Sequence, residues 1–257
     1  MKVFLIDRRW VSALIALVAC GAIFCAVSFP GVVTAASSTR QLPIYSVERE
    51  QRAASVTINI SRADIDVRPL MDALARGSVE ATFFVTGEWA QANPEDLLAL
   101  TQAGHEVMSH GQTYTHYKDL DADQIMEDVT ACGDAIEAVT GQRPALVRCP
   151  YGEFDDHVIA AIRALDLEAI QWDVDSQDWK GASAEDIRRR VLEKIEPGSI
   201  LLFHGDGTHT AEALPALLES LLGEGWRLTP VSQLLLRGEY IVDDAGRQRA
   251  APVGENE

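Results

Sequence analysis

The sequence predicts an α/β fold in which helices connect the strands of a parallel sheet. After about residue 53, short runs of β-branched or aromatic residues alternate with longer amphipathic segments. This alternation is typical of parallel strands, because each return to the same end of the sheet needs a crossover, usually a helix. An open doubly wound sheet and a closed barrel both fit the pattern.

Seven short runs have the composition of strands. Each is rich in apolar, β-branched or aromatic residues and is followed by polar or turn-forming residues. They cover residues 56–60, 81–85, 106–108, 145–148, 169–172, 199–203 and 226–229.

Three of the intervening helices have recognisable ends, and we expect them at about residues 93–104, 121–141 and 183–196. The first carries proline at its first helical position, Pro94. The second opens at Asp121 and stops at Gly141, with an apolar stripe between them. The third begins at Ser183, which forms a capping-box pattern with Asp186.

The composition indicates one sizeable domain with an N-terminal appendage, since 47% of the 257 residues are hydrophobic. The formal net charge of -17 argues against nucleic acid or anionic lipid as the main partner, because an acidic surface repels phosphates. Of the four cysteines, Cys132 and Cys149 fall in the folded part. They form no CxxC pair, and we expect free, buried thiols.

The N-terminus predicts a membrane anchor. Residues 1–9 contain Lys2, Arg8 and Arg9, and residues 10–36 contain no charge. An apolar run of this length spans a bilayer as a helix of about 20 residues. The basic cluster places residues 1–9 in the cytoplasm. We therefore expect a single-pass protein of the cell membrane with an extracytoplasmic folded domain.

Two alternatives to the anchor and a set of domain boundaries follow from the same region. A cleaved signal peptide fits the small residues at 33–35, and a lipoprotein box fits residues 17–20. The sequence then predicts a linker over residues 37–52, a folded domain over 53–236 and a C-terminal tail over 237–257.

Polar side chains gather directly after the third to sixth predicted strands. In parallel barrels and sheets the C-terminal ends of the strands form the active-site face, so these side chains are expected to share one site. They are His110, His116, Arg148, Asp175, Asp178 and His204.

The motifs that carry these residues resemble those of the polysaccharide deacetylases, which have a NodB homology domain. The motifs are ATFFVTGEWA, GHEVMSHG, RCPYG, DSQDW and LLFH, in family order over about residues 53–236. The resemblance implies a distorted (β/α) barrel of the TIM type, often with seven strands. It also implies removal of N-acetyl groups from chitin-like or peptidoglycan sugars with a divalent metal, usually zinc.

The chain departs from the family where the resemblance implies a base and metal ligands. The first family motif, Thr-Phe-Asp-Asp-Gly, supplies a general base and a metal-binding aspartate, and two histidines four residues apart complete the metal site. Here Thr57 matches, Asn59 replaces the base and Ile60 replaces the metal-binding acid. Tyr114 stands where the second histidine belongs.

The other family positions are retained. The resemblance implies His110 as a metal ligand and His204 as the general acid, with Arg148 and Asp175 organising the acid. We expect substrate contacts from the residues that follow the fourth and fifth strands, although Trp179 also fits a role in barrel packing. These residues are Pro150, Tyr151, Asp178 and Trp179. Asp175 and Asp178 could instead orient Arg148 or His204.

The departures remove chemistry that the reaction needs. An asparagine amide cannot accept a proton near neutral pH, and isoleucine offers no lone pair to a metal. A site with one ordinary ligand should bind zinc poorly, because zinc sites use three or four. His116 could replace the missing histidine if its loop bends, and Asp64 or Asp66 could reach back from the first loop.

Several further segments resemble one branch of the family, the sporulation-associated, PdaB-like deacetylases. These are the Ile60-Ser61 pair, VDSQDW, and residues 213–215 and 231–235. That branch also has a membrane-anchoring N-terminus and often departs from the metal motif.

Two functions fit the sequence. The first is an N-deacetylase acting on peptidoglycan or a related amino-sugar polymer of the cell wall. The second is a degenerate homologue that binds the glycan, or a wall-assembly partner, without hydrolysis. Asn59, Ile60 and Tyr114 separate the two, and they favour the second for metal-dependent chemistry.

Overall fold

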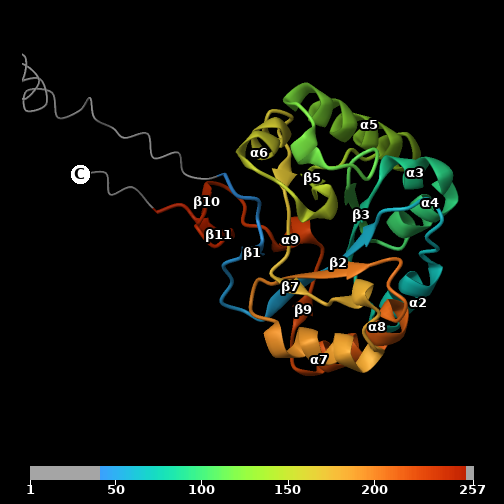
Figure 1. Ribbon diagram of the computed structural model, residues 1–257. Coiled ribbons are helices and arrows are strands. Elements are labelled where there is room, and N and C mark those ends of the chain that lie inside the picture. Colours follow the sequence, from blue (N-terminus) through green and yellow to red (C-terminus); the bar gives the residue numbers. More distant parts are fainter. Residues whose placement is uncertain (1–40, 253–257) are drawn as a thin grey trace, which may run out of the picture. The chain divides into compact units, whose positions relative to one another are not determined.

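The computed structural model describes residues 41–252, and a curled parallel sheet forms the centre of the fold (Figure 1). The strands lie in the order β6, β5, β4, β3, β2, β8, β7, and every neighbouring pair is parallel. Their bounds are β2 Ala53–Ile60, β3 Thr82–Val85, β4 Glu106–Ser109, β5 Leu146–Val147, β6 Glu168–Ala169, β7 Val174–Asp175 and β8 Ile200–His204. The predicted α/β class and parallel sheet are confirmed.

The sheet curls into a half-barrel, and the ring of strands that the resemblance implies is not continuous. Strands β6 and β7 are its two edges. A segment before β2 lies across the gap between them. Ile44 forms a parallel bridge with Ile170, and Ser46 forms an antiparallel bridge with Ser199. The seam of the barrel is therefore closed by isolated bridges.

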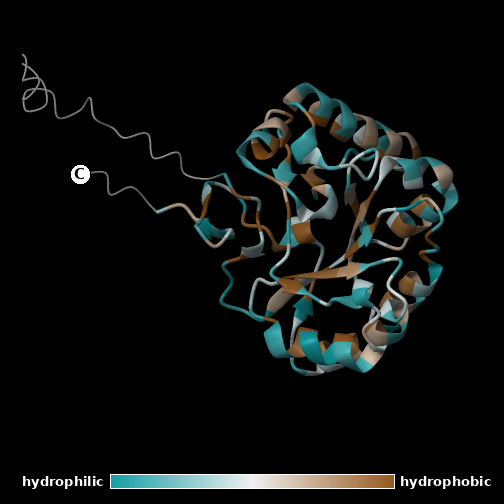
Figure 2. Ribbon diagram, viewed as in Figure 1, coloured by the Kyte–Doolittle hydropathy of each residue, from teal (hydrophilic) through white to brown (hydrophobic). Residues whose placement is uncertain are grey.

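Helices cover the outer side of the sheet, and Figure 2 shows hydrophilic residues on the outer face of α7. The predicted ends of the long helix are confirmed: Asp121 and Gln124 cap its start reciprocally, and Gly141 ends it with a φ of 70°. The helices are α2 Arg68–Gly77, α3 Gly87–Ala92, α4 Pro94–Gln102, α5 Ala122–Thr140, α6 Asp156–Arg163, α7 Ala184–Lys194, α8 Thr210–Gly223 and α9 Val231–Leu234.

Two of the predicted strands differ from the structure. The run at 169–172 is interrupted, because the Asp173 carboxylate accepts hydrogen bonds from Ser199 Oγ and the Ile200 amide and turns the chain toward β8. The chain then forms β7, which the sequence analysis missed. The run at 226–229 gives only β9, Arg227–Leu228, which pairs with the first two residues of β2.

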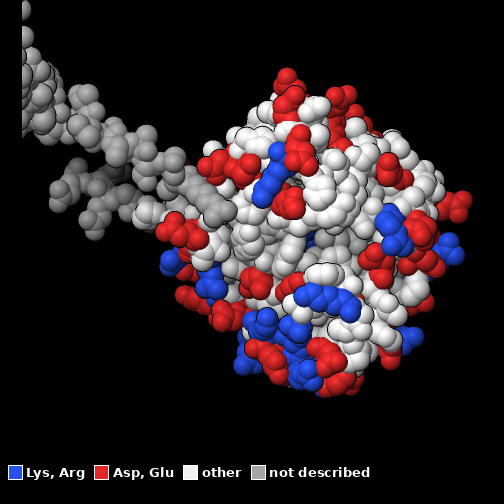
Figure 3. All heavy atoms as spheres, viewed as in Figure 1, with Lys and Arg blue, Asp and Glu red and all other residues white. Residues whose placement is uncertain are grey.

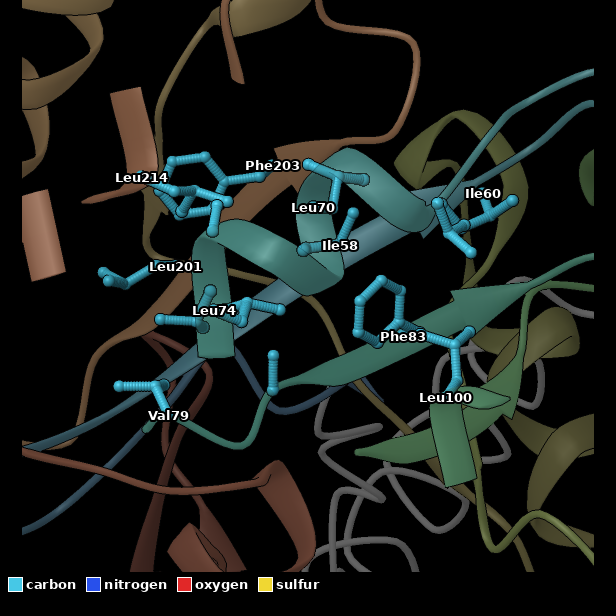
Figure 4. Close-up of a cluster of buried hydrophobic side chains, with 14 of the residues drawn as sticks. Ile58, Ile60, Leu70, Leu74, Val79, Phe83, Leu100, Leu201, Phe203 and Leu214 are labelled. Atoms are coloured by element: carbon cyan, nitrogen blue, oxygen red, sulfur yellow. The ribbon is translucent and has the colours of Figure 1, made fainter. Parts of the chain in front are cut away.

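Strand β2 is buried on both faces, and the faces have different roles. Ile58 and Ile60 pack in a hydrophobic cluster with side chains of α2 and α8 (Figure 4). Burying each such side chain contributes about 1.5 to 3 kcal/mol. Thr57 and Asn59 point to the opposite side, where both contact Arg148. The two-residue period of the strand thus separates core residues from site residues.

Parts of the predicted linker and tail form a second, small sheet. Its order is β1, β11, β10, with bounds Ser46–Val47, Arg247–Ala250 and Tyr240–Val242. Strand β1 pairs with β11 in parallel, and β10 pairs with β11 antiparallel. The boundaries at residues 53 and 236 remain predictions.

The predicted location as a single-pass membrane protein is contradicted by the described structure. No helix within residues 41–252 is long and apolar enough to cross a bilayer. The segment for which the span was predicted, residues 10–36, lies outside the described residues.

Gly198 holds the segment before β2 against β8, and its replacement should destabilise the fold. Its φ is +90°, and a Cβ there would lie 1.6 Å from the Val47 carbonyl oxygen. We expect Gly198→Ala to lower the free energy of unfolding by more than about 2 kcal/mol. Gly141→Ala is the matched control, since Gly141 has a φ of +70° and open space around it. It should lose only about 1 to 2 kcal/mol. Equal losses in urea unfolding would contradict the proposed clash.

Candidate functional site

A cleft of about 340 Å³ opens at the C-terminal ends of the central strands. Strand β2 contributes Asn59 and β8 contributes His204, while the remaining side chains come from the ends of the neighbouring strands and the loops that follow. The cleft is lined by Asn59, Ser61, Tyr114, Tyr151, Gly152, Trp172, Asp175, Trp179, Leu202, His204 and Asp206. The structure therefore brings five of the ten predicted site residues into one cleft: Asn59, Tyr151, Asp175, Trp179 and His204.

Arg148 lies behind the cleft with its side chain fully buried. Its Nη1 donates to Thr57 Oγ1 at 2.8 Å and to Asn59 Oδ1 at 2.9 Å. Its Nη2 donates to the Gln171 carbonyl at 3.0 Å. The guanidinium also lies 4.0 Å from the centre of the Phe84 ring.

No described carboxylate pairs with this buried cation, whose hydrogen bonds all go to a hydroxyl, an amide and two backbone carbonyls. Burial lowers the pKa of Arg148 to about 9, so the side chain remains charged at neutral pH. A buried charge without an opposite charge is costly, and hydrogen bonds to neutral acceptors offset only part of the cost.

Arg148 also fixes the orientation of the Asn59 amide. A guanidinium has donors and no acceptor, so the oxygen of the amide must face it. Asn59 lines the cleft, and its remaining polar atom, Nδ2, therefore lies on the cleft side. Among the described residues nothing accepts a hydrogen bond from Nδ2. The predicted position of a base thus presents an N–H donor.

Ile60 is part of the hydrophobic core. Its side chain is fully buried in the cluster that includes Ile65. The chain leaves space for it at Gly205, where a Cβ would lie 2.5 Å from Ile60 Cδ1 and 2.8 Å from Ile65 Cγ2. No metal ligand can stand at this position, because the side chain has no lone pair and packs against apolar neighbours.

His110 is buried and faces the backbone. Its Nδ1 lies 2.7 Å from the Arg148 carbonyl, which can only accept, so Nδ1 carries the proton. Its Nε2 is buried and has no hydrogen-bond partner among the described residues. Burial lowers the pKa of His110 to about 3, and the imidazole is neutral. The Tyr114 ring packs edge-on, with the ring centres 5.1 Å apart.

The proposed replacements for the missing ligands lie elsewhere. His116 stacks on Tyr151 at 4.0 Å between ring centres, and its Nδ1 lies 2.9 Å from Glu153 Oε2. Asp64 forms an exposed ion pair with Arg62. Asp66 accepts from the Arg68 amide. None of these side chains reaches His110.

The donor set does not fit zinc. Within residues 41–252 no group of three or more His, Cys, Asp or Glu side chains could hold a metal ion. Of the positions that the resemblance assigns to the metal, His110 offers an unpaired imidazole nitrogen, while Ile60 lies in the core and Tyr114 packs its ring beside His110. A zinc site needs three or four ligands, so this chain lacks the ligands that the family resemblance implies.

His204 and Asp178 form an intact pair at the cleft. Asp178 Oδ1 lies 2.8 Å from His204 Nδ1, and Oδ2 accepts from the His204 amide at 2.7 Å and from Thr210 Oγ1 at 2.7 Å. Burial alone would raise the pKa of Asp178, but the hydrogen bonds from His204 and Thr210 outweigh it and lower the pKa below its usual value. Asp178 therefore orients the imidazole.

The role predicted for Asp175 differs from the structure. Asp175 lines the cleft, and its Oδ1 accepts from the Gln177 amide at 2.7 Å. It makes no described contact with Arg148 or His204. Asp178, which we expected to contact substrate, is buried and pairs with His204, the role that was predicted for Asp175.

Aromatic side chains form the walls of the cleft. Tyr151 is 49% exposed and Trp179 is 55% exposed, so part of each ring remains accessible to a ligand. His116 stacks on one face of Tyr151, and Lys180 Nζ lies 4.7 Å from the centre of the Trp179 ring. Tyr151 adopts a φ of 58° in the short turn 150–152, above buried Pro150. Its hydroxyl donates to the Tyr114 carbonyl at 3.2 Å.

Asp128 is a residue that the sequence analysis missed. Its carboxylate accepts from the backbone amides of Gln112 and Thr113 and from the Tyr117 hydroxyl, and so it holds the loop that carries Tyr114. A signal was available: the position lies three residues after Ile125 and four before Cys132, on the apolar stripe of the helix. A carboxylate on the apolar face of a helix needs hydrogen-bond donors from neighbouring residues, because its burial is otherwise costly.

Asn59→Asp should stabilise the protein, because it places a carboxylate where Oδ1 already accepts from Arg148. We expect the free energy of unfolding at pH 7 to rise by about 1 to 3 kcal/mol. Asn93→Asp is the matched control and should destabilise, since Asn93 Nδ2 donates to the carbonyls of Ala63 and Trp89. Denaturant unfolding measures both free energies. A loss of stability in Asn59→Asp would contradict the inference that the buried charge of Arg148 lacks an opposite charge.

Asp178→Asn should change the pH dependence of stability. The pKa of Asp178 is lower in the folded protein than in the unfolded chain. Its contribution is therefore fully present above about pH 4 and is lost as the pH falls through the folded-state pKa. We expect a loss of about 2 to 3 kcal/mol at pH 7 that shrinks below about pH 4. Asp64→Asn, at an exposed position, is the control. A difference independent of pH would refute this role.

Comparison with known proteins agrees with the motifs and the fold. A family model described as polysaccharide deacetylase matches residues 48–170. The peptidoglycan-N-acetylmuramic acid deacetylase PdaC of Bacillus subtilis is 29% identical over 74% of this chain, which spans only 40% of that relative. The chitooligosaccharide deacetylase of a Bradyrhizobium strain is 28% identical over 76% of this chain and 99% of the relative.

A solved structure adds a structural neighbour. It is described as a CE4 family pseudoenzyme from Bacillus anthracis, is 30% identical and has a TM-score of 0.71. The match covers 75% of this chain and 68% of the neighbour. The finer assignment to the sporulation-associated, PdaB-like branch is not confirmed by these matches. The retained motifs, the curled parallel sheet and the matches agree that the chain belongs to the polysaccharide deacetylase family.

Proposed function

We propose that this chain binds an N-acetylated cell-wall glycan in the cleft without hydrolysing it through a metal-activated water. The observation that carries the proposal is the amide at position 59, whose oxygen is taken by Arg148 and whose nitrogen faces the cleft. An amide in this orientation cannot remove a proton from water. The donor set that would activate the water is absent from the described residues as well.

The glycan is supported by the shape and chemistry of the cleft. Tyr151 and Trp179 are about half exposed, and a sugar ring can pack its C–H groups against the uncovered parts of these rings. Polar groups at the floor, from Asn59 and His204, can bond to sugar substituents. The names of the relatives refer to peptidoglycan and chitin-type oligosaccharides, and one structural neighbour is described as a pseudoenzyme.

The charged surface agrees with a neutral ligand. Figure 3 shows acidic side chains scattered over this face, while Lys and Arg side chains gather mainly over α7. With a formal net charge of -17, the chain has little long-range attraction for polyanions. A neutral sugar polymer carries no such penalty.

A second candidate is N-deacetylation of the same glycan, which the His204–Asp178 pair favours. The pair is intact at 2.8 Å, and an imidazole held by a buried carboxylate can protonate a leaving amine. The chain still needs a nucleophile for this reaction, and the described cleft residues offer no metal site and no carboxylate at position 59 to activate one.

Binding and acetate release, measured on the same sample of the full chain, test the proposal. We expect a tetramer of N-acetylglucosamine to bind, as followed by calorimetry, with no acetate released. Trp179→Ala should weaken binding by about fivefold to tenfold, because it removes an exposed ring from the wall. Leu98→Ala, which removes an exposed apolar side chain from α4, is the control and should bind like the wild type.

Two outcomes would overturn the proposal. If the chain bound neither the tetramer nor soluble peptidoglycan fragments, a cell-wall glycan would be ruled out as its ligand. Acetate release that requires zinc, with stoichiometric zinc lost in His110→Ala, would establish the metal-dependent deacetylase instead.

A further inference from the structure

We propose that the cleft discriminates between acetylated and deacetylated amino sugars and prefers the acetylated form. This inference rests on the glycan-binding function proposed above and deepens it. Its basis is the replacement of a carboxylate by the Asn59 amide in front of a buried cation. The floor of the cleft therefore presents a hydrogen-bond donor where a carboxylate would present an acceptor.

The hydrogen-bonding groups of Asn59 favour a ligand that offers an acceptor. Asn59 Oδ1 is held by Arg148 Nη1 at 2.9 Å, so the group turned to the cleft is the Nδ2 donor. An acetamido group offers a carbonyl oxygen to this donor. A protonated amine has only donors, and it would leave Nδ2 without an acceptor in a residue that is 4% exposed.

The charge of Arg148 disfavours a protonated amine in the cleft. Arg148 is fully buried, has no carboxylate partner among the described residues, and lies one hydrogen bond behind Asn59. A charged amine at Asn59 would place two positive charges close together in a site shielded from water. A carboxylate at position 59 would neutralise Arg148 and accept from the amine, so the substitution at this one position should determine the preference.

Two acidic residues of the cleft would favour the amine over the acetamido group. Asp206 Oδ2 accepts from Arg62 at 3.3 Å, and Asp175 Oδ1 accepts from the Gln177 amide. Both line the wall and would attract an amine. Neither forms a hydrogen bond with Asn59, whereas Arg148 does, at 2.9 Å.

Calorimetry with two matched ligands tests the inference on the full chain. The ligands are the N-acetylglucosamine tetramer and its fully deacetylated counterpart, at about pH 6, where the amine is protonated. We expect the wild type to bind the acetylated tetramer at least about tenfold more tightly, the equivalent of one unsatisfied buried donor. Asn59→Asp should bring the two affinities to within about threefold or reverse them.

A matched variant separates local from long-range charge. Gln51→Glu adds the same negative charge at an exposed position outside the cleft and should keep the wild-type preference. Equal wild-type affinities for the two tetramers would overturn the inference and leave the proposed function standing. Binding of neither ligand would overturn the proposed function itself. A preference that survives in folded Asn59→Asp would show that position 59 does not set it.

Discussion

The buried guanidinium of Arg148 is the interaction on which the site depends. It joins the end of β5 to β2 through Thr57 and Asn59, and to the chain after β6 through the Ile170 and Gln171 carbonyls. A charge in this position must be surrounded by acceptors, because its desolvation is otherwise uncompensated. The guanidinium therefore ties strands that come from distant parts of the sequence, and it decides which atom of Asn59 faces the cleft.

The intact His204–Asp178 pair and the substituted metal position are physically separate in this chain. His204 and Asp178 keep their geometry, since Thr210 and the His204 backbone satisfy the carboxylate independently of any metal. At the position where the family resemblance implies a metal-binding aspartate, Ile60 packs in the core, and Gly205 leaves room for its side chain. The side chain at this position therefore contributes to the packing of the core and offers no lone pair to a metal.

The sequence predicted these parts to unequal degrees. Local rules predicted the long helix from Asp121 to Gly141, and the order of the motifs predicted that Asn59 and His204 would share one cleft. The sequence left open whether Asp175 or Asp178 orients His204, because their three-residue spacing does not say which one turns inward. Strand β7 is only two residues long, too short for any periodicity, and its pairing with β8 depends on the turn at Asp173.

The pairing of β1 with β11 has a consequence for how the chain assembles. The two strands are joined across 201 residues, as in the contact of Arg249 with Glu48. Contacts of such sequence separation pay the largest loop-closure entropy and form late. During synthesis, residues 44–47 can bridge the open seam of the sheet, but their outer partner does not exist until residue 247 has been made. A nascent chain that stops short of β11 would present β1 as an unpaired edge, available to another chain.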